Sequence, residues 1–282
     1  MTVKPAPAGT GIVFKRVDLG EDAVIKTIAS NVSCTARSTT LTQGDASIST
    51  IEHLMSAFCG MGIDNALVEI DNVEVPILDG SASLYVEAFQ ADGLVEQDAE
   101  KVLVTVPEEI FVEDGKSGSW VRISPASEPS FDVTVDFGSK VLGVQSFHWD
   151  GSVDYAAEIG KCRTFVFFHE IEFLFQNNLV KGGDVENAIV IVEHPVQKDQ
   201  LERLSALFNV PELSVSEGGY LNNLSLRFPN ECGRHKMLDM MGDLMLCGGC
   251  LAAKVTAFKP GHGINTRAAK AVIDAISAKN CI

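Results

Sequence analysis

The chain has 282 residues, of which 46% are hydrophobic and 21% are charged, and its formal net charge at pH 7 is −16. This length can bury a full core and allows two domains, while the strong negative charge argues against binding to nucleic acid. No apolar run approaches the roughly 18 residues that a membrane-spanning helix needs, and the start MTVKPAPAGTG does not resemble a signal peptide. We therefore expect a cytoplasmic protein with no integral membrane segment.

The first hundred residues alternate short strands and helices. Strands are predicted over 11–16 and 65–71, and a third over 75–82, where VPILDGSA runs into a glycine turn. A helix is predicted from Ser49 to Gly62, because Ser49 stands three residues before Glu52 in a capping-box pattern and glycines close the segment. A second helix covers 83–93.

The rest of the chain begins after the charged stretch EQDAEK at 96–101, which looks like a domain boundary. Seven cysteines are scattered along the sequence, and the single CxxC pair, Cys247 and Cys250, predicts a helix end with free thiols rather than a zinc site. The elements predicted here are strands over 102–114, 119–126, 130–137, 187–193 and 220–228, a strand from residue 250 that leads to a loop at His262, and helices over 153–165, 170–178, 197–208, 234–249 and 265–278.

One of these helices, RHKMLDMMGDL at 234–244, places His235, Asp239 and Asp243 in one row, because positions i, i+4 and i+8 share a face. A solvated polar stripe is the ordinary explanation, and a metal face is the alternative. The order of histidine, helix, glycine and strand near residue 53 is repeated near residue 235. We therefore predict an α+β fold of two similar halves, residues 1–100 and 101–282, each a sheet with helices on one face. If the helix layers meet, the stripe is buried and its charges need partners or a metal.

Three of the six histidines stand at special places. His53 and His235 each begin the main helix of their half, and His262 lies in the Gly-flanked loop KPGHG. Two imidazoles and a carboxylate, from His53, His235 and Asp239, are a ligand set for catalytic zinc. A weaker rival site is His169 with Glu170 and Glu172.

Neighbouring residues complete a hydrolytic site. Glu52 adjoins His53 and could take a proton from the attacking water, while Asp243 could orient a protonated His262. A capping role for Glu52 remains an alternative, because a capping glutamate is tied back to the backbone.

Several long motifs occur together and in order: STIEHLMSAFCGMGIDNALVEIDNVEVPILDGSA, KCRTFVF, NNLVKGGDVENAIVI, RHKMLDMMGDL and FKPGHGIN. From about residue 4 to about residue 276 the chain resembles the UDP-3-O-acyl-N-acetylglucosamine deacetylases of lipid A biosynthesis. The resemblance implies two α+β domains whose helix layers are sandwiched between two sheets. It also implies zinc-dependent removal of the N-acetyl group as acetate, the committed step of lipid A biosynthesis.

The resemblance assigns roles residue by residue. His53, His235 and Asp239 match the Zn²⁺ ligands, Glu52 the general base, and His262, oriented by Asp243, the cationic residue that helps to protonate the leaving amine. Thr164 matches the hydroxyl that stabilises the oxyanion, a residue that the sequence pattern alone does not select.

Further positions match substrate contacts. Phe165 matches a ring that packs on the substrate, and Lys236 and Lys259 match contacts to the diphosphate, although each lysine could be a plain surface residue. The segment FVFFHEIEFLFQNNLVKGG matches an insert that forms a tunnel for the acyl chain, and core packing would select the same apolar residues. The tunnel residues predicted are Phe167, Phe168, Leu174, Val180 and Gly183.

The resemblance also predicts partners and departures. The expected partner is an acylated UDP-sugar, and the protein is expected to be a monomer. Relatives usually begin with a further strand pair carrying a segment such as GVGLHSG, which we expect this chain to lack, and some relatives continue into a fused dehydratase that is not visible here. Two alternatives stay open: a zinc amidohydrolase acting on another acylated substrate, and an inactive binding or assembly module.

Overall fold

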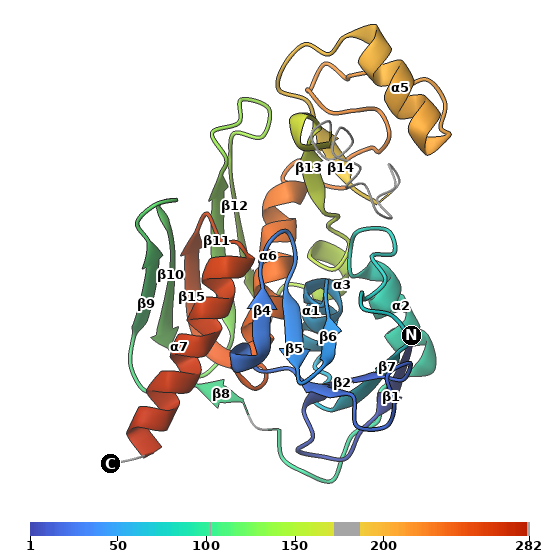
Figure 1. Ribbon diagram of the computed structural model, residues 1–282. Helices are drawn as coiled ribbons and strands as arrows, with labels where there is room; N and C mark the ends of the chain where they lie inside the picture. Colours follow the sequence, from blue (N-terminus) through green and yellow to red (C-terminus); the bar gives the residue numbers. More distant parts are fainter. Residues whose placement is uncertain (102, 172–186, 281–282) are drawn as a thin grey trace.

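A computed structural model describes residues 1–101, 103–171 and 187–280 of the chain, and it is a mixed α+β structure with several sheets (Figure 1). A four-stranded sheet has the order β1-β7-β2-β3, in which β2 is parallel to β7 and the other pairs are antiparallel. Alternate residues of its strands are buried, as expected for a sheet with one covered face. Its strands are β1 (Thr2–Pro5), β2 (Ile12–Arg16), β3 (Val24–Lys26) and β7 (Ala66–Ile70).

A small antiparallel sheet of three strands lies between β3 and the first long helix in the sequence. It has the order β4-β5-β6, and a short 3-10 helix, η1 (Ala29–Asn31), precedes it. The strands are β4 (Val32–Cys34), β5 (Thr40–Gln43) and β6 (Ala46–Ile48).

A larger sheet of six strands has the order β12-β11-β15-β10-β9, with β8 paired to β15. Val133 on β11 and Val121 on β10 both lie opposite Ala257 of the central strand β15, and all three side chains are buried. Hydrophobic residues at every second position therefore give this sheet its covered face. The strands are β8 (Val104–Thr105), β9 (Ile110–Asp114), β10 (Ser119–Pro125), β11 (Ser130–Asp136), β12 (Val144–Asp150) and β15 (Leu251–Phe258).

The principal helices pack around the contact between α1 and α6. α1 and α6 pack against each other, α6 also contacts β11 and β12, and α7 contacts α6, β9 and β10 (Figure 1). One hydrophobic cluster includes Phe14 of the four-stranded sheet, Phe58 of α1, Leu238 of α6 and Val255 of β15. The helices are α1 (Glu52–Met61), α2 (Ser83–Asp92), α3 (Tyr155–Glu158), α6 (Glu231–Leu244) and α7 (His262–Asn280), with the 3-10 helix η2 (Met245–Cys247) after α6.

A smaller unit carries its own apolar cluster. The parallel strands β13 (Phe165–Phe167) and β14 (Ile189–Ile191) form a two-stranded sheet, and α5 (Lys198–Phe208) follows. The cluster includes Phe168, Val192 and Leu204 and is separate from the main one. In Figure 1, α5 and this two-stranded sheet lie at one end of the molecule, beyond α6.

Most predicted elements that lie within the described residues are confirmed within a few residues, and five differ. The predicted strand over 102–114 forms as two strands, β8 and β9, and the helix predicted over 170–178 lies largely outside the described residues. No strand forms over 75–82, where Pro76 lacks the N–H that a ladder needs, and the residue before this segment, Glu74, makes an isolated bridge with Ser49. The predicted strand over 220–228 reduces to bridges at Tyr220 and Leu221. The helix predicted over 153–165 is limited to α3, and His262 begins α7 rather than lying in a loop.

Two further predictions concern termini of helices and thiols. Gly62 ends α1 in the left-handed conformation with φ 70°, as its position predicts. The six described cysteines are free thiols, and the CxxC segment follows α6 at η2, confirming the helix end. The division at residue 100 stays a prediction. Among the described residues no helix is long and apolar enough to cross a membrane.

Candidate metal centre

Three side chains converge where α1 meets α6. His53 comes from the first turn of α1, and His235 and Asp239 lie one turn apart on α6. Their ligand atoms all lie within 4.8 Å of one another, and each residue is at most 4% exposed. Nε2 of His235 lies 3.3 Å and Nε2 of His53 3.6 Å from Oδ1 of Asp239. This set, the His53–His235–Asp239 cluster, is the group that the sequence predicts.

The burial of α6 explains why its polar row is not a solvated stripe. His235, Asp239 and Asp243 are each 1% exposed or less, because α1 covers the face of α6 that carries them. The helices approach closely at Gly242, where a Cβ atom would lie 2.0 Å from the carbonyl oxygen of Glu52. Only glycine allows this spacing, and the spacing brings His53 to the other two side chains.

The cluster has the donor atoms that a cation needs. Oδ1 of Asp239 is buried without a hydrogen-bond partner among the described residues, although a buried carboxylate oxygen normally has one. Nδ1 of His235 lies 3.0 Å from the carbonyl oxygen of Cys162, a contact that fixes the tautomer and turns Nε2 toward the cluster. Two imidazoles and one carboxylate fit a divalent ion with an open position.

The electrostatics favour the ligand-competent protonation states. Burial lowers the pKa of His235 to about 3, so its imidazole is neutral at pH 7. Burial alone would raise the pKa of Asp239, but its electrostatic interactions with the His235 ring and the Lys236 ammonium outweigh burial and hold this pKa well below its ordinary value. A metal ion binds deprotonated ligands, so little free energy is lost in preparing these residues.

Glu52 and His262 lie beside the cluster on the side of α7. Nε2 of His262 is 4.0 Å from Oε1 of Glu52 and 4.0 Å from Oδ2 of Asp239. Nδ1 of His262 lies 2.9 Å from Oδ2 of Asp243, which also accepts a bond of 2.9 Å from Asn265. A carboxyl and an imidazole thus face each other next to a ligand set for a cation.

The capping-box interpretation of Glu52 is wrong. Ile51 is the N-cap residue of α1 and Glu52 the first helical residue, while the hydroxyl of Ser49 donates to the carbonyl oxygen of Val73. Oε2 of Glu52 instead accepts a bond of 3.1 Å from the backbone N–H of Thr39. The side chain is therefore turned toward the site and not back to its own helix.

The remaining predicted residues are placed unequally. Phe165 lies against His235 with ring centroids 6.3 Å apart, and Nζ of Lys236 lies 5.3 Å from the Phe165 ring while bonding Asp239 at 2.7 Å. Thr164 directly precedes Phe165, and its N–H donates to the carbonyl oxygen of Gly80. Lys259 pairs with Asp136 at 3.3 Å, and no described contact brings it to the cluster.

The tunnel prediction is largely outside the described residues, which include neither Leu174 nor Val180 nor Gly183. Phe168 packs in the small apolar cluster beside Leu204, and Phe167 contacts Phe137 and Phe165 edge to face.

The rival site of His169 does not form among the described residues. Its ring stacks on Phe167, while Glu170 accepts a bond from the Phe167 N–H and lies 3.8 Å from Arg37. Glu172 lies outside the described residues.

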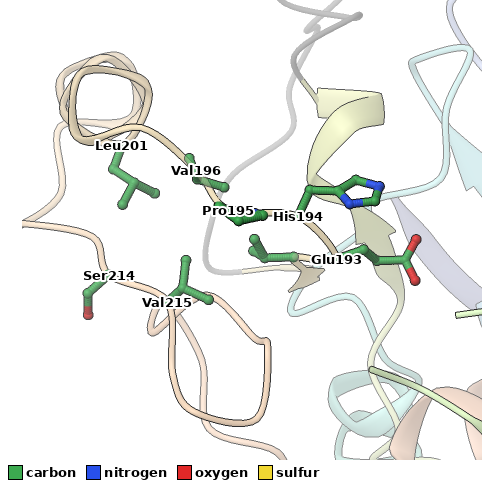
Figure 2. A pocket seen from close by; sticks show the side chains of 8 residues that line it. Glu193, His194, Pro195, Val196, Leu201, Ser214 and Val215 are labelled. Atoms are coloured by element: carbon green, nitrogen blue, oxygen red, sulfur yellow. The ribbon is translucent and has the colours of Figure 1, made fainter. Parts of the chain in front are cut away.

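A cavity of about 470 Å³ occurs elsewhere, beside α5. Figure 2 shows that the side chains of Glu193 and His194 extend to one side, away from Leu201 and Ser214. The other residues that line this cavity are Val192, Pro195, Val196 and Val215. None of them belongs to the His53–His235–Asp239 cluster, so the cavity is separate from the candidate metal centre.

Two residues that make polar contacts in the site, Thr39 and Asn265, are not predicted from the sequence. Thr39 bonds Glu52 and Asp243, and Asn265 bonds Asp243. Asn265 could have been found from the segment HGIN, because residues i and i+3 share a helix face. That inference needs His262 to lie in the helix, whereas the sequence predicts it in a loop. Thr39 has no such signal, since the chain brings it to the site over a long distance.

Comparisons with known proteins agree with this geometry. The family model for UDP-3-O-acyl N-acetylglycosamine deacetylase (LpxC) matches residues 1–206 and 211–274. A protein of Pseudomonas entomophila named UDP-3-O-acyl-N-acetylglucosamine deacetylase is 40% identical over 278 residues, covering 97% of this chain and 82% of that protein. One of the same name from Myxococcus xanthus is 39% identical over 274 residues, covering 97% of this chain and 79% of that protein.

A longer relative is also similar. The bifunctional enzyme LpxC/FabZ of Porphyromonas gingivalis is 42% identical over 272 residues. The match covers 96% of this chain and 59% of that enzyme, so the chain spans a little over half the length of this relative.

Proposed function

Because this chain belongs to the family of UDP-3-O-acyl N-acetylglycosamine deacetylases, we propose that it hydrolyses the N-acetyl group of a UDP-3-O-acyl-N-acetylglucosamine in lipid A biosynthesis. Acetate and the free amine are the products. The observation that carries this proposal is the buried His53–His235–Asp239 cluster with Glu52 and His262 beside it. We propose zinc as the ion of this cluster, because two imidazoles and a carboxylate are a ligand set of catalytic zinc.

When bound, zinc supplies Lewis-acid polarisation of the amide carbonyl and lowers the pKa of water. Glu52 takes a proton from the attacking water at Oε1, the oxygen that faces His262. His262 gives a proton from Nε2 to the amine nitrogen as the C–N bond breaks, while Nδ1 is held by Asp243. Thr164 donates its hydroxyl to the carbonyl oxygen as negative charge develops there.

Substrate contacts are part of the same proposal. Phe165 and Lys236 lie next to His235 and would meet the sugar nucleotide, the lysine through its charge. Lys259 is proposed as a more distant diphosphate contact, and Gly183 as part of the acyl channel. The aromatic cluster of Phe137, Phe165 and Phe167 gives an acyl chain an apolar path beside the metal centre. We also propose that α1 and α6 belong to the helix layers of two α+β halves enclosed by their sheets, which the α1–α6 contact supports.

The test is acetate release from an acylated UDP-N-acetylglucosamine, with and without a chelator. We expect release that stops when the metal is removed and returns when Zn²⁺ is added. Other N-acylated sugars serve as the comparison substrates. Release from those substrates alone would replace the proposed activity with that of another amidohydrolase, and no hydrolysis of any of them by zinc-loaded protein would contradict it.

The pH dependence of kcat/KM should be bell-shaped. Burial is the main cause that raises the pKa of Glu52 above its ordinary value, and activity rises with pH as this base ionises. Burial lowers the pKa of His262, but the charge and hydrogen bond of Asp243 outweigh burial and raise this pKa to about 9. Activity should therefore fall as pH rises through about 9, where His262 loses its proton.

Measuring kcat/KM against pH in Asp243→Asn checks whether the fall of activity at high pH, the basic limb of the profile, belongs to His262. Without the Asp243 charge, the basic limb should move to lower pH. Asp132→Asn is the matched control, because Asp132 pairs with the exposed residue His148 at 2.7 Å and has no described contact with Glu52, His262 or the cluster. A basic limb at the same pH in Asp243→Asn and wild type would remove His262 from this role.

A further inference from the structure

Thr39 lies between two of the carboxylates of the site. It directly precedes β5 and its relative exposure is 0%. Its backbone N–H donates to Oε2 of Glu52 at 3.1 Å, and its Oγ1 hydroxyl donates to Oδ1 of Asp243 at 2.6 Å. One residue thus bonds the first residue of α1 and the last turn of α6.

The two hydrogen bonds from Thr39 determine which carboxylate oxygen of Glu52 and of Asp243 remains free to act in the reaction. Thr39 occupies Oε2 of Glu52, and Oε1 is the oxygen that lies 4.0 Å from Nε2 of His262. Thr39 likewise occupies Oδ1 of Asp243, and Oδ2 is the oxygen that accepts from His262 and Asn265. Each carboxylate therefore has one oxygen bonded to Thr39 and the other directed at its partner in the site.

The residue that follows Thr39 is anchored in the small sheet and not in either helix. The next residue, Thr40, pairs with Cys34 of β4 across the hairpin, and the carbonyl of Thr40 accepts a bond from Ser33. The small sheet thus provides a fixed point from which Thr39 reaches Glu52 and Asp243. Hydrogen bonds to charged groups are stronger than neutral ones, and a buried carboxylate oxygen that loses its donor is destabilised.

We propose that Thr39 is a positioning residue for the hydrolysis, which fixes Glu52 and Asp243 in the orientations that their separate roles require. This inference rests on the proposed function. Among the described contacts Thr39 bonds neither a ligand of the cluster nor the reacting atoms, so it acts through the two carboxylates. Because the orientation matters for the chemical step and not for holding the sugar nucleotide, the effect belongs to kcat rather than KM.

The test compares Thr39→Val with Thr39→Ser in zinc-loaded protein. Valine has the shape of threonine without the hydroxyl, and we expect kcat to fall about tenfold or more while KM changes by less than about twofold. Serine keeps the hydroxyl and should recover most of the lost kcat. The matched control is Thr40→Val, because Thr40 is half-buried and its side chain bonds neither carboxylate among the described contacts. Its kcat should remain at the wild-type value.

A measurement that needs no substrate separates this inference from the proposed function. The proton NMR signal of the His262 Nδ1–H reports its bond to Asp243, and it should shift in Thr39→Val but not in Thr40→Val. If wild-type protein releases no acetate, the proposed function fails while this comparison still tests the contact. If Thr39→Val does not fold, Thr39→Cys takes its place with the same expectations, because it is similar in size and only a weak donor.

Two outcomes would overturn the inference. The first is a Thr39→Val enzyme whose kcat is within about twofold of wild type. The second is an equal loss of kcat and of thermal stability in Thr39→Val, Thr39→Ser and Thr40→Val, which is the result of a structural role alone.

Discussion

Glu52→Gln is expected to lower kcat by about 100- to 10,000-fold while the metal stays bound and the fold survives. Glutamine has the size of glutamate and its amide oxygen can still accept the bond that Thr39 donates to Oε2. It cannot take a proton from water at the oxygen facing His262. The loss therefore reports the base function and not the contact with Thr39.

The measurement combines single-substrate kinetics with metal analysis and thermal unfolding. Glu74→Gln is the matched control, because Glu74 is an exposed glutamate near the start of α1 that accepts a bond of 3.0 Å from Thr50. Its kcat should be unchanged. A Glu52→Gln enzyme with near-normal kcat would end the assignment of Glu52 as the general base.

Asp239→Asn and His235→Ala are expected to lose the bound ion, and acetate release should fall to the background rate. Each change removes one of three ligands, and the asparagine variant keeps an oxygen for the bond from Lys236, so the ammonium is not left unpaired in the interior. Zinc per chain is measured after dialysis. Wild type should retain one ion.

His148→Ala is the control for this experiment. His148 also lies among carboxylates, 2.7 Å from Asp132 and 3.2 Å from Asp150, but on an exposed part of the sheet. Its removal should leave the zinc content unchanged. Full retention of zinc in both Asp239→Asn and His235→Ala would refute the ligand assignment.

The helices α1 and α6 could be predicted because their sequences record their period and the glycines that follow them. The i, i+4 spacing of His235 and Asp239 placed both side chains on one face, and the cluster is where that spacing predicts it. The burial of the row followed from the repeated helix–glycine–strand order, which implied that α6 has no free side. These features are local, or are repeated locally, and a sequence displays them directly.

The errors have equally physical causes. Glu52 was open to a capping interpretation because Ser49 stands at the right spacing, but the serine backbone is engaged with Val73 and the helix begins later. His262 was placed in a loop by its flanking proline and glycine, although the carbonyl of Gly261 accepts from Ile264 and Asn265 and so opens α7. A tertiary partner, Val73, decided the boundary at Ser49, whereas the hydrogen bonds of the first helical turn decided it at His262.

Strand prediction failed where side chains compete for the backbone. In the segment 220–228, Asn222 accepts from the N–H of Ser214 and Asn223 donates to the carbonyl of Ala188. Such bonds fix a loop in place of a ladder. The roles of Thr164 and Thr39 could not be predicted for another reason. A single threonine belongs to no spacing or periodic pattern, so its role depends on the residues that fold against it.

The close approach of α1 and α6 at Gly242 bears on how the protein folds. Because one proposed ligand comes from α1 and two come from α6, we expect high affinity for the ion only after the helices have docked in the correct register. The free energy of ion binding then stabilises the correctly docked helices relative to every misdocked arrangement. A chain whose helices meet one turn out of place offers two ligands instead of three. An ion bound by the three proposed ligands would therefore stabilise the correctly docked chain before any substrate binds.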